Sequence, residues 1–130
     1  MRDLIEAAQA ARKNAHAPYS KFYVGSAMRD EHGRIHAGGN IENAAYPQGW
    51  CAECSAIAHL VGAGAKQIIE VVVIGNGDNL CTPCGGCRQK IREFAKGAVE
   101  IHCCAESGKL LRTFTLEELL PASFGPEDLK

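Results

Sequence analysis

The residues of this chain that could do chemistry gather in two short stretches, Cys51-Ala52-Glu53 and Pro83-Cys84-Gly85-Gly86-Cys87. Together they supply three thiols and one carboxylate. Three thiolates can fill three corners of a zinc tetrahedron and leave the fourth corner for water. A nearby glutamate that is not a ligand can move the protons of that water. The two stretches therefore predict a zinc site with a catalytic carboxylate, provided that the fold brings them together.

The spacing within each stretch predicts how the helices must begin. Cys84 and Cys87 lie three positions apart in the first turn of a predicted helix, which puts both sulfurs on one face. A helix N-terminus carries partial positive charge and favours the thiolate. Cys51 and Glu53 are two positions apart and would diverge within a regular helix. We therefore expect Cys51 to stand at the very start of its helix, before helical dihedral angles set in, so that two helix N-termini face each other across the metal.

The same cysteines allow a closed structural zinc site as an alternative. Cys51-x-x-Cys54 and Cys84-x-x-Cys87 form a CxxC…CxxC pair, which would leave no catalytic position. The 29 residues between Cys54 and Cys84 exceed the usual ribbon spacing of about 15–20. They also contain a predicted helix and a predicted strand, which is too much structure for a ribbon loop.

Three further cysteines lie outside both zinc patterns. Cys81-Thr82-Pro83-Cys84 has the outline of a dithiol redox motif before a helix, but such a pair needs neither a third thiol nor a glutamate. Cys103 and Cys104 lie in an apolar segment and are most simply small core residues.

Length and composition indicate one domain, residues 1–130, with 46% hydrophobic and 22% charged residues. The 14 basic and 15 acidic residues are scattered and give a net charge of -1, which argues against a nucleic-acid partner. No apolar run could span a bilayer, and the first residues lack the apolar core of a signal peptide. An odd number of cysteines without a secretion signal favours metal ligation or catalysis in a reducing cytosol. We therefore expect a cytoplasmic protein with no membrane partner.

Helices and strands alternate in the predicted secondary structure. The expected helices span residues 3–15, 51–61 and 83–95, and a short one follows the capping-box pair Thr115 and Glu118. The expected strands span residues 22–28, 35–41, 68–74, 99–103 and 110–114. Residues 68–74 are nearly all β-branched, which is typical of a central strand covered on both faces. The alternation predicts an α/β domain with three layers.

With these motifs the chain resembles the small zinc-dependent cytidine deaminases of nucleoside salvage. Matching segments occur in the expected order at residues 17–22, 24–25, 39–46, 118–121 and 123–129. The resemblance implies an α/β/α sandwich around a five-stranded mixed sheet, assembled as a homotetramer. It also implies hydrolysis of cytidine and deoxycytidine to uridine and deoxyuridine plus ammonia, in pyrimidine salvage. Two alternatives stay open: a deaminase of another aminopyrimidine nucleoside, and a non-catalytic zinc module that binds a partner protein.

The resemblance also implies roles for individual residues. One zinc ion per chain would be held by Cys51, Cys84 and Cys87, with Glu53 as the proton carrier. The implied substrate-binding residues are Phe22 at the pyrimidine, Asn40 and Glu42 at the ribose hydroxyls, Ala52 in the site, Ala44 and Tyr46 at a neighbouring subunit's ligand, and Phe124 over a neighbour's base. A carboxylate at the ribose would repel an esterified phosphate, which favours free nucleosides over RNA or DNA.

Position 54 departs from the family pattern. Many members carry an arginine there, which helps to neutralise three thiolates on one zinc, whereas this chain has Cys54. Arg88, one residue past Cys87, and the two helix N-termini are expected to carry more of that task. The alternative is that Cys54 becomes a fourth ligand and closes the site.

Overall fold

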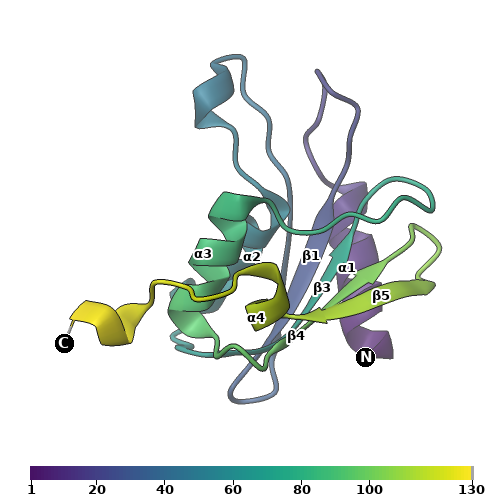
Figure 1. Ribbon diagram of the computed structural model, residues 1–130. Helices are drawn as coiled ribbons and strands as arrows, with labels where there is room; N and C mark the ends of the chain where they lie inside the picture. The colour runs from purple at the N-terminus through teal and green to yellow at the C-terminus, as the bar shows by residue number, and fades with distance from the viewer. Residues whose placement is uncertain (130) are drawn as a thin grey trace.

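The computed structural model describes residues 1–129, which form a five-stranded mixed sheet with helices on both faces (Figure 1). The strands lie in the order β2-β1-β3-β4-β5. Their bounds are β1 (Gly25–Asp30), β2 (Ile35–Gly39), β3 (Ile68–Ile74), β4 (Glu100–Cys104) and β5 (Leu110–Thr115). β3 and β4 pair in parallel, and the other neighbours are antiparallel.

The helices form the two outer layers of the predicted sandwich. The bounds are α1 (Arg2–Lys13), α2 (Ala52–Gly62), α3 (Gly85–Phe94) and α4 (Leu116–Leu119), with single 3₁₀ turns at η1 (Tyr46–Gln48) and η2 (Pro126–Leu129). α1 covers one face of the sheet, while α2 and α3 cover the other. The three-layer α/β/α arrangement is therefore confirmed. Among residues 1–129, no helix has both the length and the apolar character needed to cross a bilayer.

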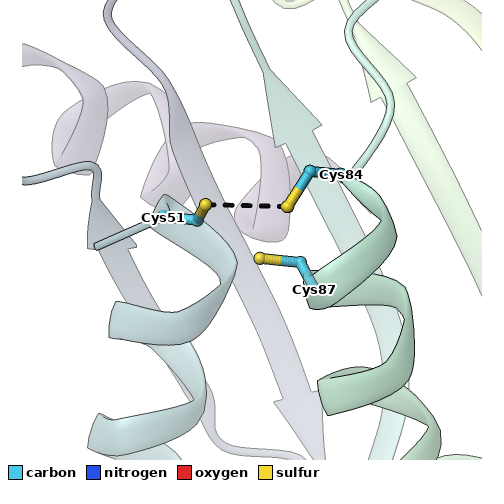
Figure 2. A group of neighbouring side chains, drawn as sticks. All are labelled: Cys51, Cys84 and Cys87. Atoms are coloured by element: carbon cyan, nitrogen blue, oxygen red, sulfur yellow. Dashed lines mark hydrogen bonds between the residues drawn. The ribbon is translucent and has the colours of Figure 1, made fainter. Parts of the chain in front are cut away.

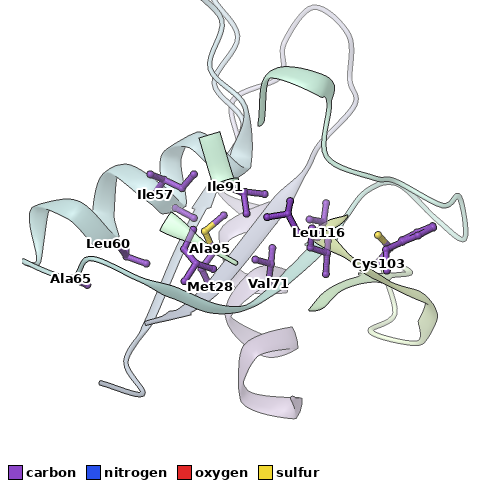
Figure 3. Close-up of a cluster of buried hydrophobic side chains, with 14 residues drawn as sticks. Met28, Ile57, Leu60, Ala65, Val71, Ile91, Ala95, Cys103 and Leu116 are labelled. Carbon is purple, nitrogen blue, oxygen red and sulfur yellow. The ribbon is translucent and has the colours of Figure 1, made fainter. Parts of the chain in front are cut away.

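Two hydrophobic cores fill the spaces between these layers. Val71 and Val73 of β3 point into the larger core beneath α2 and α3, and Val72 and Ile74 point into the smaller core beneath α1. Figure 3 shows the larger core, in which side chains from α2, α3 and the sheet interdigitate. The prediction that residues 68–74 form a central strand covered on both faces is confirmed, because alternate side chains serve both cores.

Predicted element ends differ from the structure where side chains intervene. The strand expected from residue 22 begins only at Gly25, because the side chain of Asn40 accepts from the Val24 N–H and donates to the Phe22 carbonyl. The next strand ends at Gly39 rather than at residue 41. The capping box at Thr115 and Glu118 is confirmed in both of its hydrogen bonds.

The packing of α1 on β1 depends on the missing side chain of Gly25. A Cβ atom there would lie 2.1 Å from the backbone oxygen of Ala8. We expect Gly25→Ala to lower the free energy of unfolding by about 3 kcal/mol, because rigid backbone must move to accommodate the methyl group. Urea unfolding followed by circular dichroism measures this. Gly62→Ala is the matched control, because the added Cβ would meet no atom within 4 Å apart from its chain neighbours and the backbone of its own helix. Equal stability of the two variants would contradict the tight packing at Gly25.

Candidate active site

Cys51, Cys84 and Cys87 meet between the N-terminal ends of α2 and α3. Their sulfur atoms all lie within 4.8 Å of one another, and the sulfurs of Cys51 and Cys84 are 3.7 Å apart. Figure 2 shows the three side chains converging, one from the start of α2 and two from the start of α3. Zinc–sulfur bonds of about 2.3 Å at tetrahedral angles place two sulfurs about 3.8 Å apart. The spacing therefore fits a tetrahedral zinc ion with one position left for another ligand.

Both helices begin in the way that the spacing of the motifs requires. Cys51 is the N-cap of α2, with φ -75° and ψ 156°, and Cys84 is the N-cap of α3, with φ -65° and ψ 166°. These extended dihedral angles confirm that Cys51 precedes the helical conformation. They also place α3 two residues later than predicted, because Pro83 and Cys84 stay outside the helix. Two helix N-termini, with their partial positive charge, thus flank the thiols.

The three thiols are too close to ionise together without a cation. Hydrogen bonding from Cys87 lowers the pKa of Cys51 to about 6; burial opposes this, while Cys84 and the charge of Lys90 lower the pKa further. The hydrogen bond to Cys51, together with burial, raises the pKa of Cys87. The first thiolate therefore keeps its neighbour protonated, and a dication between them would stabilise several thiolates at once. The chemistry of this donor set fits zinc.

Glu53 lies in the first turn of α2 and is only 4% exposed. Burial raises the pKa of Glu53 to about 7; a hydrogen bond from its own backbone N–H lowers the pKa, and the charge of Cys51 raises it. A carboxyl group that titrates near neutral pH can both accept and return a proton. Glu53 lines the same pocket as Cys51 and Cys84, so the carboxylate and the thiols predicted to act together do meet.

Cys54 stands beside the thiol group without belonging to it. Within residues 1–129, the His, Cys, Asp and Glu residues whose ligand atoms converge within 4.8 Å are Cys51, Cys84 and Cys87. Cys54 is 7% exposed, and burial raises its pKa. The geometry therefore favours an open three-thiol site over the closed site in which Cys54 is a fourth ligand.

The redox alternative at Cys81 finds little chemical support. Burial, together with the charge of Glu53, raises the pKa of Cys81 to about 11. A thiol held protonated at neutral pH is a poor nucleophile for disulfide exchange. Cys103 and Cys104 are 0% and 1% exposed, as expected of small core residues.

Arg88 braces the loop that leads to Cys84. Its guanidinium group donates to three neutral oxygens: the Pro83 carbonyl at 2.8 Å, the Leu119 carbonyl at 2.9 Å and Thr82 Oγ1 at 3.0 Å. These contacts fix the two residues before Cys84 and tie them to the end of α4. The hydrogen bonds of Arg88 thus indicate a positioning function.

A pocket of about 230 Å³ opens onto the thiols and Glu53. Three of the predicted substrate-binding residues, Phe22, Asn40 and Ala52, line it. The complete lining is Phe22, Val24, Asn40, Cys51, Ala52, Glu53, Cys81, Thr82 and Cys84. The residue pattern did not predict Val24, Cys81 and Thr82 at the site, and the only signal for the last two is their position just before Cys84.

Asn40 holds one wall of this pocket in place. Its Oδ1 accepts from the Val24 N–H at 2.9 Å, and its Nδ2 donates to the Phe22 carbonyl at 2.9 Å. The half-exposed Phe22 ring is thereby presented from an extended loop rather than from a strand.

Glu42 and Tyr46 line a second hollow of about 420 Å³, together with Tyr19, Ser20, Asn43 and Gly49. The Glu42 carboxylate accepts hydrogen bonds from the Ser20 hydroxyl and from the backbone N–H groups of Tyr19 and Ser20. The Ser20 hydroxyl contributes most to lowering the pKa of Glu42; burial opposes this, and the two N–H groups lower it further. Residues 19–22 therefore contribute to both hollows.

Besides Glu42, three predicted substrate-binding residues lie outside the thiol pocket of their own chain. Tyr46 is 77% exposed, Phe124 is 58% exposed, and Ala44 is also exposed. Phe124 lies on the C-terminal segment, where its carbonyl accepts from Gln89 of α3. The structure of one chain brings none of the three to the thiols.

Comparisons with known proteins extend over nearly the whole chain. Residues 1–103 match the family model described as the cytidine and deoxycytidylate deaminase zinc-binding region. A cytidine deaminase of Sporosarcina psychrophila is 40% identical over 97% of this chain and 92% of its own length. A probable cytidine deaminase of Dictyostelium discoideum is 39% identical over 96% of this chain and 84% of its own length. The crystal structure of a cytidine deaminase from Burkholderia pseudomallei superposes with a TM-score of 0.86 at 38% identity, covering 94% of this chain and 97% of that one.

Proposed function

This chain belongs to the cytidine and deoxycytidylate deaminase family, and we propose that it hydrolyses cytidine and deoxycytidine to uridine and deoxyuridine with release of ammonia. The observation that carries the proposal is the cluster of three converging thiols, two of which line one pocket with the buried Glu53. Zinc is the cofactor. Cys51, Cys84 and Cys87 would hold one zinc ion per chain.

The chemistry divides between the metal and Glu53. When bound, zinc lowers the pKa of water from ~15.7 towards ~7 and so supplies a nucleophile at neutral pH. Glu53 accepts the proton of the attacking water and delivers it to ring N3. The oxygen of the water has by then bonded to ring C4, and Glu53 passes its second proton to the amino group, which leaves as ammonia when the C4–N bond breaks. One water is consumed and one ammonia is released, so Glu53 ends the cycle in its starting state.

Residues of this pocket and of the second hollow would orient the nucleoside. Phe22 lies in the lining, where a flat pyrimidine could stack on its ring. Asn40 keeps one amide proton beyond its bond to Phe22, and the Glu42 carboxylate keeps lone pairs for hydroxyl donors. A ribose hydroxyl can accept a hydrogen bond from the Asn40 amide and donate one to the Glu42 carboxylate.

Replacing Glu42 by alanine is expected to raise KM for cytidine and to lower kcat/KM by about 10–100-fold. A hydrogen bond to a charged group contributes about 1.5–3 kcal/mol, and the ribose contact does not change during the reaction, so kcat should fall less. Steady-state kinetics measure the effect, with Glu93→Ala, an exposed carboxylate on α3 outside both hollows, as the control. An unchanged KM in Glu42→Ala would show that Glu42 does not bind the ribose.

Free nucleosides are the substrates that the charges favour. The net charge of -1 gives no overall attraction for a polyanion, and the Glu42 carboxylate would repel a phosphate on the ribose. We therefore place the activity in pyrimidine salvage in the cytoplasm, with neither nucleic acid nor membrane as partner. An ultraviolet assay on cytidine, deoxycytidine, cytidine monophosphate and an oligonucleotide tests this. Turnover of the oligonucleotide comparable to that of cytidine would refute the proposal.

Self-association as a homotetramer would give Ala44, Tyr46 and Phe124 a function. Their exposure in the single chain suits contacts to a neighbouring subunit. We expect sedimentation to show a mass of four chains.

Co-assembly of Glu53→Gln subunits with Phe124→Ala subunits should recover activity beyond the sum of the two separate variants, with about a quarter of the sites intact at random mixing. No recovery would mean that Phe124 does not act across subunits.

A further inference from the structure

The proposed zinc site carries an unbalanced charge. Three thiolates and one Zn²⁺ sum to -1, and the buried carboxylate of Glu53 adds to this when ionised. The two helix N-termini offset part of it, each with about half of an elementary charge. A full positive charge close to the thiols would stabilise the site further. Cys54 is neutral, and the hydrogen bonds of Arg88 go to three neutral oxygens, so neither group supplies that charge by direct contact.

The side chain of Lys90, on α3, places its ammonium group near Gly86. Its ammonium nitrogen is 3.7 Å from the position that a Cβ atom on Gly86 would occupy. Gly86 stands between Cys84 and Cys87, and it lies four residues, about one helical turn, before Lys90. The lysine chain therefore folds back along the helix and sets its charge over the turn that carries two of the thiols. A larger residue at position 86 would compete with the ammonium group for this space.

We propose that Lys90 is the residue that balances the charge of the zinc–thiolate site, and that it thereby increases zinc retention without contacting substrate. This inference rests on zinc ligation by Cys51, Cys84 and Cys87 under the proposed function. Because Lys90 is exposed, solvent screens part of its effect, and the effect should depend on ionic strength.

Zinc transfer from the holoprotein to a chromophoric chelator tests the proposal without any need for activity. Lys90→Met removes the charge but keeps an unbranched side chain, and Lys90→Arg keeps the charge. We expect zinc affinity to fall about tenfold in Lys90→Met and to stay within about twofold of wild type in Lys90→Arg. The loss should be largest near 0.01 M salt, where the Debye length is about 30 Å, and should nearly vanish near 1 M, where it is about 3 Å.

Two further variants separate charge from packing. Lys96→Met removes an exposed lysine beyond the C-terminal end of α3 and should leave zinc affinity unchanged. An added Cys54→Arg substitution in the Lys90→Met background should restore part of the lost affinity, because it returns a positive charge beside Cys51. Equal zinc affinity of Lys90→Met and Lys96→Met at low salt would overturn the proposal, as would a loss that salt does not change. Wild-type protein without zinc would instead contradict the proposed metal site itself.

Discussion

Substitution of Glu53 by glutamine should reduce kcat for cytidine by at least about 10³-fold while zinc content stays near one ion per chain. Glutamine keeps the size of the side chain but cannot accept and return a proton at neutral pH. A positioned acid–base contributes about 10²–10⁴ in rate, and Glu53 is assigned more than one proton transfer. The thiols proposed to hold zinc are untouched, and the buried amide occupies the same volume at the start of α2. Stopped assays of product formation and elemental analysis of the same preparation measure both quantities.

The matched control for this substitution is Glu93→Gln, which changes an exposed carboxylate on α3. It should retain wild-type kcat. Glu53→Gln with activity comparable to wild type would show that another group carries the protons. Loss of zinc together with activity would mean instead that Glu53 supports the metal site.

Replacing one of the three proposed ligand thiols should cause a large loss of zinc affinity and of activity. Cys84→Ser should lower zinc affinity by about 10²–10³-fold, since zinc sites of four ligands bind with about 10–16 kcal/mol and each ligand carries roughly a quarter of this. The serine hydroxyl stays protonated at neutral pH and is a weak zinc ligand. Activity should fall with zinc content, and a given amount of added zinc should raise the midpoint of thermal unfolding less than in wild type. Chelator competition and differential scanning calorimetry test these expectations.

Cys54→Ser is the matched control, because it makes the same atomic change at a buried thiol outside the three-sulfur group. It should keep its zinc and most of its turnover. A loss of zinc as large as that in Cys84→Ser would show that Cys54 is a ligand and that the site is closed.

Local sequence patterns were sufficient for the parts of the site that depend on neighbouring residues. Cys51 and Glu53 can face the same space only if Cys51 precedes the regular helix, so their spacing predicted that Cys51 is the N-cap. The extended dihedral angles at Cys51 confirm this prediction. The β-branched run at residues 68–74 predicted the central strand for a similar reason: both faces of that strand must be apolar.

Contacts between distant residues could not be predicted in this way. Asn40 converts residues 22–24 from a strand into a loop through two side-chain hydrogen bonds, and no local pattern signals a partner 16 or 18 residues away. Arg88 was predicted to offset charge, yet its bond to the Leu119 carbonyl, 31 residues on, turns its donors to neutral oxygens. Lys90 received no role because an exposed helical lysine is ordinary until its ammonium group is placed over Gly86.

Release of ammonia from cytidine, by wild-type protein whose zinc has been removed and then restored, tests the deaminase site most directly. The apoprotein should be inactive, and activity should rise in proportion to bound zinc until it levels off at one ion per chain, with uridine formed in equal amount to ammonia. Full zinc occupancy without release of ammonia would contradict the assignment of the three thiols and Glu53 as a deaminase site, and so would turnover that does not depend on zinc.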